Sequence, residues 1–206
     1  MLTQRERHLN QALRLGYFTV SWNVVEGIIA IVAASVAGSR ALLGFGLDSS
    51  IESISAVVLI WRLRVERRDP ARADRVERQA VRLIGVTFFL LAAFVAVESV
   101  RSLVGQQEPD ASPIGIAVTA VSLMVMPVLA RRKRALAVEM GRKAVEADSA
   151  QTRACAYLSA VVLGGLILNA ALGWWWADPA AALVVVVLLV LEGREALTAE
   201  HVDDCC

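Results

Sequence analysis

The stretch Gly46-Leu47-Asp48-Ser49-Ser50-Ile51-Glu52-Ser53-Ile54-Ser55 places two acidic residues inside a sequence that is otherwise apolar enough to cross a membrane. The surrounding apolar run, residues 41–63, has the length of a helix that spans a hydrocarbon core of about 30 Å. Asp48 and Glu52 are four positions apart, so both carboxyl groups project from one helical face. An acid at the bilayer centre costs about 3 kcal/mol on insertion scales, so this pair needs a partner, and the cheapest partner is a cation.

The chain as a whole has the composition of an integral membrane protein. Its 206 residues are 57% hydrophobic and its mean hydropathy is positive. Six apolar stretches are each about as long as a spanning helix requires, namely residues 17–38, 41–63, 83–104, 114–130, 154–172 and 174–191. A membrane β-barrel would instead show alternating segments of about ten residues. We therefore expect an all-α membrane protein, a six-transmembrane-helix bundle.

The basic residues predict the orientation of this bundle. Of the 21 Lys and Arg residues, all except Arg40 and Arg101 fall in the N-terminal segment, in residues 62–82, in residues 131–153 or in the tail. The positive-inside rule then places both termini and both long loops in the cytoplasm. Acidic residues are interspersed in the basic loops and topology already explains the charge, so we expect no nucleic-acid partner.

The same pattern predicts the domain organisation. We expect a cytoplasmic N-terminal segment over residues 1–16, a six-span transmembrane domain over residues 17–192 and a short cytoplasmic tail over residues 193–206. The first apolar run shows no cleavage pattern, so this span is expected to be retained. We expect a multi-pass protein of the plasma (inner) membrane.

A second pair of polar residues lies in the first predicted span. Asn23 and Glu26 are three positions apart on one helical face, and Glu26 is close to mid-membrane. The turn at residues 38–40 is short, so the first two spans should be antiparallel neighbours with Glu26 at the depth of Glu52. Glu26 is either a protonated acid in an interhelical hydrogen bond or a proton carrier beside Asp48 and Glu52, with Asn23 in support.

The start of the fifth span holds a similar pair. If this helix begins near Ala147, Gln151 and Cys155 present an amide oxygen and a thiol to the bundle on one face. The helix must then begin within a water-filled vestibule, because Gln151 would otherwise lie too shallow to meet Glu52. Arg153 would have to snorkel or face another cytosolic element. Alone, the pair is weak evidence, since a Cys in a membrane helix is usually apolar filler.

Other features have structural interpretations. Gly44 and Gly46 permit close helix packing. Glu98 and Arg101 are three positions apart and predict an ion pair near the outer surface, with an exit ligand as the alternative. Asp178 and Pro179 are typical of a helix N-cap and first position. The tail residues His201, Asp203, Asp204, Cys205 and Cys206 contain enough ligands for a soft-metal site, and equally fit a frayed end.

Two polar pairs on the second and fifth of six spans, with Asp178-Pro179 opening the sixth, resemble the transmembrane domain of the cation diffusion facilitator (cation efflux) family. The resemblance covers residues 24–194. It implies a divalent-metal efflux transporter, usually dimeric and often coupled to proton entry. Its metal ligands fall on Asp48, Glu52, Gln151 and Cys155, where Glu, Gln and Cys replace the family's usual Asp, His and Asp. It also implies a truncated member without the C-terminal cytosolic domain, so that a homodimer would form through the membrane bundle.

This donor set favours zinc, with Co²⁺, Cd²⁺ or Fe²⁺ as alternatives, because two carboxylates, a thiolate and an amide oxygen suit a tetrahedral ion. Metal and protons compete for the same ligands, which favours antiport. We expect no enzyme and no tightly bound cofactor, because no nucleophile–base arrangement is visible. The expected partners are the metal ion, membrane lipid and a second copy of the chain. The alternative function is a non-transporting membrane metal sensor or an assembly partner of another transporter.

Overall fold

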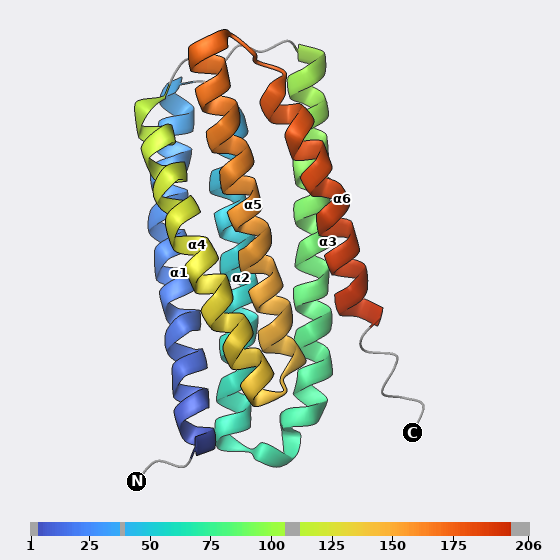
Figure 1. Ribbon diagram of the computed structural model, residues 1–206. Coiled ribbons are helices and arrows are strands. Elements are labelled where there is room, and N and C mark those ends of the chain that lie inside the picture. Colours follow the sequence, from blue (N-terminus) through green and yellow to red (C-terminus); the bar gives the residue numbers. More distant parts are fainter. Residues whose placement is uncertain (1–3, 38–39, 106–111, 199–206) are drawn as a thin grey trace.

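The computed structural model describes residues 4–37, 40–105 and 112–198 and arranges them as a bundle of long helices (Figure 1). The helices are α1 (Gln4–Ala37), α2 (Arg40–Arg68), α3 (Ala73–Gly105), α4 (Pro113–Met140), α5 (Lys143–Leu172) and α6 (Ala177–Thr198), with a short 3₁₀ helix η1 (Pro70–Arg72) between α2 and α3. Within these described ranges there are no strands, and α1 to α5 are each long and apolar enough to cross a membrane. The predicted all-α membrane bundle of six helices is confirmed.

Consecutive helices run in opposite directions and pack in pairs. The closest packing joins α1 with α2, α4 with α5, and α3 with α6. Figure 1 shows α2 and α5 between the α1 and α4 helices on one side and the α3 and α6 helices on the other. Direct contacts between α2 and α5 therefore place the two sequence stretches with polar pairs at the centre of the bundle.

The helices extend beyond the predicted spans. The polar segment before Tyr17 is the first part of α1, and Leu9, Ala12 and Leu13 within it are buried in the core. α6 begins at Ala177, so Asp178 lies inside the helix and not at the predicted N-cap position. The difference is small because the Trp-rich segment before it forms a turn that ends one residue earlier than expected.

α4 has a capped start and a short connection to α5. α4 begins after Ser112, whose side chain accepts a hydrogen bond from the Gly115 amide at 3.1 Å, and Pro113 occupies its first turn. The helix ends at Gly141, which has a positive φ of 59° that a side chain would disfavour. This short turn makes α4 and α5 antiparallel neighbours.

Gly46 sets the distance between α1 and α2. A Cβ atom at this position would lie 2.7 Å from Ile31 Cγ1 and 3.2 Å from the carbonyl oxygen of Gly27. The backbones thus approach as closely as the predicted small-residue contact requires. Gly44, in contrast, would meet only Phe94, at 3.7 Å, which is an ordinary contact.

We expect Gly46→Ala to lower the free energy of unfolding by about 1–3 kcal/mol, because α1 and α2 must separate to admit the methyl group. Gly164→Ala is the matched control, since a Cβ atom there would meet nothing within 4 Å. Thermal unfolding of both variants in detergent measures the difference. Equal melting temperatures for the two variants would show that the α1–α2 contact is not tight.

Candidate functional site

Two buried carboxyl groups of α2 form the centre of the site. Asp48 and Glu52 are 2% and 0% exposed, and they lie on the face of α2 that points toward α1 and α5. The thiol of Cys155, on α5, lies close to both carboxyl groups, and Glu26, on α1, is within electrostatic range of both. Residues from three helices therefore meet at one depth in the bundle, as expected for Glu26 and Glu52 from the short α1–α2 turn.

Several polar atoms around this centre are buried and lack a hydrogen-bond partner among the described residues. They are both carboxyl oxygens of Glu52, one each of Asp48 and Glu26, and the amide oxygen and nitrogen of both Asn23 and Gln151. An unpartnered buried polar atom costs about 1–3 kcal/mol, and native proteins contain few of them. Their concentration on one set of facing helices makes this region the candidate site for a polar or charged ligand.

Gln151 and Cys155 are both in the buried part of α5. Their side chains are 0% and 2% exposed, and Cys155 lies beside the two carboxyl groups of α2. Asn23 and Glu26 are likewise buried on α1. The structure thus brings Asp48, Glu52, Cys155 and Glu26 close together and buries Gln151 and Asn23 in the same interior.

The predicted ligands are not assembled into a closed cation cage. In residues 4–37, 40–105 and 112–198, no group of three or more His, Cys, Asp or Glu side chains has a geometry that could hold a metal ion. The metal-ligand role of Asp48, Glu52, Gln151 and Cys155 therefore stays a prediction. The tail residues His201, Asp203, Asp204, Cys205 and Cys206 lie outside the described residues.

α5 begins earlier than its apolar run, as the predicted site requires. The helix begins at Lys143, well before the apolar part of the segment, so Gln151 lies in the third turn of a continuous helix. Arg153 faces another element, as one of the two predicted solutions requires, because its guanidinium donates to the carboxylate of Glu192 on α6. The charge of Arg153 is therefore compensated at the edge of the bundle.

A buried ion pair next to the site was not predicted. The ammonium group of Lys133, on α4, lies 2.7 Å from Asp148 Oδ2, on α5, and the two side chains are 1% and 0% exposed. Lys133 also donates to Thr152 Oγ1 at 2.8 Å, and Ser55 Oγ donates to Asp148 Oδ1 at 3.4 Å. The sequence places Lys133 in the basic cluster that sets the topology, and nothing in that cluster distinguishes the one residue that turns inward.

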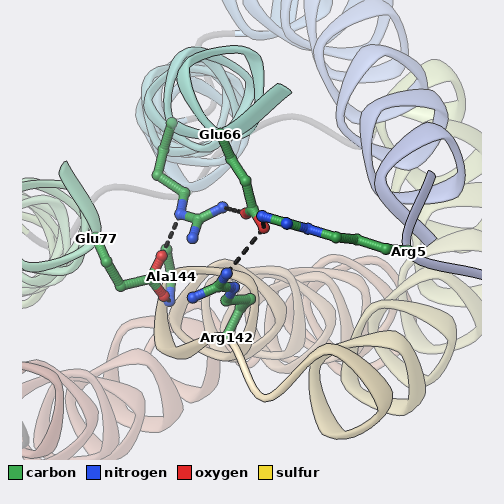
Figure 2. Close-up of polar contacts among 6 residues, drawn as sticks. Arg5, Glu66, Glu77, Arg142 and Ala144 are labelled. Carbon is green, nitrogen blue, oxygen red and sulfur yellow. Dashed lines mark hydrogen bonds and ion pairs between the residues drawn. The ribbon is translucent and has the colours of Figure 1, made fainter. Parts of the chain in front are cut away.

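A second charged network closes the end of the bundle that the positive-inside rule assigns to the cytoplasm, which we call the inner end (Figure 2). Its centre is Arg62, fully buried on α2, which donates to Glu66 on the same helix and to Glu77 on α3. Glu66 also accepts from Arg5 at 3.0 Å and from Arg142 at 2.8 Å. The network thus joins α1, α2, α3 and the start of α5.

Glu66 lies beyond the apolar run of residues 41–63, and its ionisation is tuned by this network. Burial alone would raise the pKa of its carboxyl group, but hydrogen bonds from Arg62 and Arg5 and the charges of Arg62 and Arg142 outweigh burial and hold the pKa below its ordinary value of 4.5. Glu66 is therefore charged at neutral pH and binds the surrounding arginines.

The network also caps the N-terminus of α5. The residue before this helix, Arg142, makes no side-chain cap, and the amide of Ala144 instead donates to Glu77 Oε1 of α3 at 2.8 Å. Figure 2 shows the Glu77 side chain directed at Ala144. A carboxylate at a helix N-terminus satisfies a free amide and interacts favourably with the helix dipole.

On the opposite, outer side a pocket of about 50 Å³ reaches Asp48. Residues of α2, α3, α5 and α6 line it, and its polar lining residues besides Asp48 are Glu98, Ser99 and Ser102 near the outer end of α3. The predicted ion pair between Glu98 and Arg101 is present, at 3.1 Å. The pocket thus extends from Asp48 toward the outer end of α3, while the charged networks lie on the inner side.

Comparison with known proteins identifies a family of transport domains. The family described as the cation efflux transmembrane domain matches residues 17–199. The chain is also 23% identical to an uncharacterized transporter of Methanocaldococcus jannaschii over 152 residues, which is 71% of this chain and 54% of that protein. It therefore spans about half the length of the curated relative that it matches.

Proposed function

Because the chain belongs to the cation efflux family, we propose that it transports a divalent metal cation across the membrane, with zinc as the preferred substrate and protons as the counter-ion. The chain is a multi-pass integral membrane protein. The site that we propose for the cation lies between the second and fifth helices, at Asp48, Glu52, Gln151 and Cys155.

The observation that carries this proposal is the set of buried, unpartnered oxygen atoms on facing helices. Asp48, Glu52 and Gln151 supply oxygen atoms that make no hydrogen bond to any described residue, and the thiol of Cys155 lies beside the two carboxyl groups. A purely structural role would not explain why these polar atoms are buried without hydrogen bonds, because such burial costs free energy. A cation between α2 and α5 would satisfy them after modest movement of the two helices.

The donor types favour zinc over harder ions. Zinc is held in proteins by four ligands drawn from carboxylate, imidazole and thiolate groups, whereas Mg²⁺ keeps an octahedral oxygen shell. Cys155 adds a soft ligand that would also admit Cd²⁺ or Co²⁺. Because carboxyl and thiol groups must lose their protons to bind metal, binding releases protons. Glu26, near Glu52 on the neighbouring helix, is placed to accept one of them.

The direction of the cation path follows from the surroundings of the site. The small pocket extends from Asp48 toward Glu98 and Ser102 near the outer end of α3, which supports access to the site from the outer side. Transport requires a second conformation that opens toward the inner side. We further propose that two copies associate through the transmembrane bundle and that the protein resides in the plasma (inner) membrane.

Zinc flux into proteoliposomes that contain an entrapped zinc dye tests this function. We expect zinc uptake well above that of protein-free liposomes, and faster uptake when a proton gradient opposes the metal gradient. Co²⁺ and Cd²⁺ should compete with zinc, and Mg²⁺ should not, because it rejects the thiol.

The absence of flux for zinc, cobalt, cadmium and iron from well-folded protein would contradict transport and favour the sensor or assembly-partner alternative. Zinc binding measured on the same preparation separates these two, because a sensor binds the ion and an assembly partner has no need to. Flux that is indifferent to the proton gradient would contradict antiport alone.

A further inference from the structure

The buried pair of Lys133 and Asp148 lies on the inner side of the carboxyl site. α2 runs from the outer to the inner side, so Ser55, three residues after Glu52, is about 4.5 Å further inward. α5 runs in the opposite direction, so Asp148, three residues before Gln151, is displaced inward by a similar distance. Both helices independently place the contact between Ser55 and Asp148 one turn inward of the site.

The pair and its hydrogen bonds join α2, α4 and α5 on the inner side of the site. Lys133 of α4 contacts Asp148 and Thr152 of α5 at 2.7 and 2.8 Å, and Ser55 of α2 donates to Asp148. All four side chains are buried, at 1% exposure or less. Within the described residues, the pocket that reaches Asp48 lies on the outer side and is lined by none of these four residues.

We infer that Lys133 acts as a tethered cation that closes the inner entrance of the proposed transport site and must leave Asp148 before a metal ion can pass. This inference rests on the proposed function. An ammonium group on a flexible four-carbon stem is suited to the role, because it can exchange a buried carboxylate for water at the membrane surface. Its neighbours Arg131, Arg132 and Arg134 are already exposed there.

The chemistry of the pair explains why the entrance stays closed without metal. Separating two buried charges leaves each one uncompensated, which is strongly unfavourable. A divalent cation that arrives at Asp148 removes this obstacle, because it replaces the ammonium group as the partner of the carboxylate. The Oγ atoms of Ser55 and Thr152 would then offer two further oxygen ligands for the ion at the entrance.

Accessibility of Cys155 to a membrane-impermeant maleimide tests the inference without relying on flux. The background carries Cys205→Ser and Cys206→Ser, so that Cys155 is the one remaining thiol. We expect Lys133→Gln to raise the labelling rate from the cytoplasmic face of inside-out vesicles by roughly tenfold, because the closed population is no longer favoured. Labelling from the outer face of intact cells should not rise.

Lys133→Gln combined with Asp148→Asn provides a second variant in which no buried charge is left unpaired, and the same increase is expected. Arg132→Gln is the matched control, because it removes an exposed charge from the same cluster and should leave the labelling rate unchanged. Unchanged cytoplasmic labelling in both the single and the double variant would overturn the inference.

The labelling result is separate from the proposed function itself. If wild-type protein shows no metal flux while labelling still increases in the Lys133 variants, the entrance is closed by Lys133 and transport is the part that fails. If wild-type flux is present and labelling does not change, transport stands and the entrance lies elsewhere.

Discussion

Replacing Asp48 by Asn is expected to reduce zinc flux into proteoliposomes by on the order of 100-fold, because metal sites lose at least about tenfold in affinity even when groups behind the ligands are changed. The substitution keeps the size of the side chain and removes one of the two carboxylates that we propose as ligands. Glu52→Gln should have a similar effect. Zinc uptake into proteoliposomes with the entrapped dye measures the effect in both variants.

The same substitution is expected to leave the fold intact or to stabilise it. Asp48 is buried with an unpartnered oxygen beside a second carboxyl group, so an isosteric amide, which cannot ionise, removes the cost that ionisation would carry there. Melting temperature and gel-filtration profile should therefore equal or exceed those of wild type. Glu139→Gln is the matched control, since Glu139 is 58% exposed and pairs with His8, outside the site. Retained zinc flux in Asp48→Asn would remove Asp48 from the site.

Glu66→Gln is expected to lower the free energy of unfolding at neutral pH by about 3 kcal/mol, because it leaves three arginines around a neutral side chain in a largely buried network. The effect depends on pH in a definite direction. The pKa of Glu66 lies below 4.5 in the folded protein, so its stabilising contribution is fully present above about pH 4.5. That contribution is lost as the pH falls through the folded pKa.

Thermal unfolding of wild type and Glu66→Gln between pH 7 and pH 3.5 measures this dependence. The two melting temperatures should differ most at pH 7 and converge below pH 4.5, since protonation of Glu66 makes the wild type resemble the variant. Glu139→Gln again serves as the exposed control and should follow the wild type throughout. A difference that stays constant over the whole range would show that the charge of Glu66 is not what binds the arginines.

The fold could be predicted from the sequence because the patterns that indicate it are local. An apolar run of the required length predicts a helix without knowledge of its neighbours, and the distribution of Lys and Arg orients the runs. The full lengths of the helices could not be predicted in the same way. The first part of α1 is polar in composition, and it is helical and partly buried because Leu9 and Leu13 pack against other helices.

Part of the candidate site could be predicted from the sequence for the same reason. Asp48 and Glu52 stand out because an acid inside an apolar run is costly, and their spacing places them on one face. The inward position of Lys133 could not be predicted from the sequence. Its partner Asp148 lies across the α4–α5 turn, and the adjacent arginines look equivalent in the sequence. The partners of Glu66 are 61 and 76 residues away, and no local pattern reports such a separation.

The hydrogen bond between Glu77 and the amide of Ala144 has a consequence for the order of events during synthesis. The acceptor belongs to α3 and the donor to α5, so the ribosome delivers the carboxylate well before the helix start that it caps. Arg62 and Glu66 of α2 are in place earlier still. The capping carboxylate has therefore already been synthesised when the first turn of α5 leaves the ribosome, and capping of α5 requires α3 to be in place.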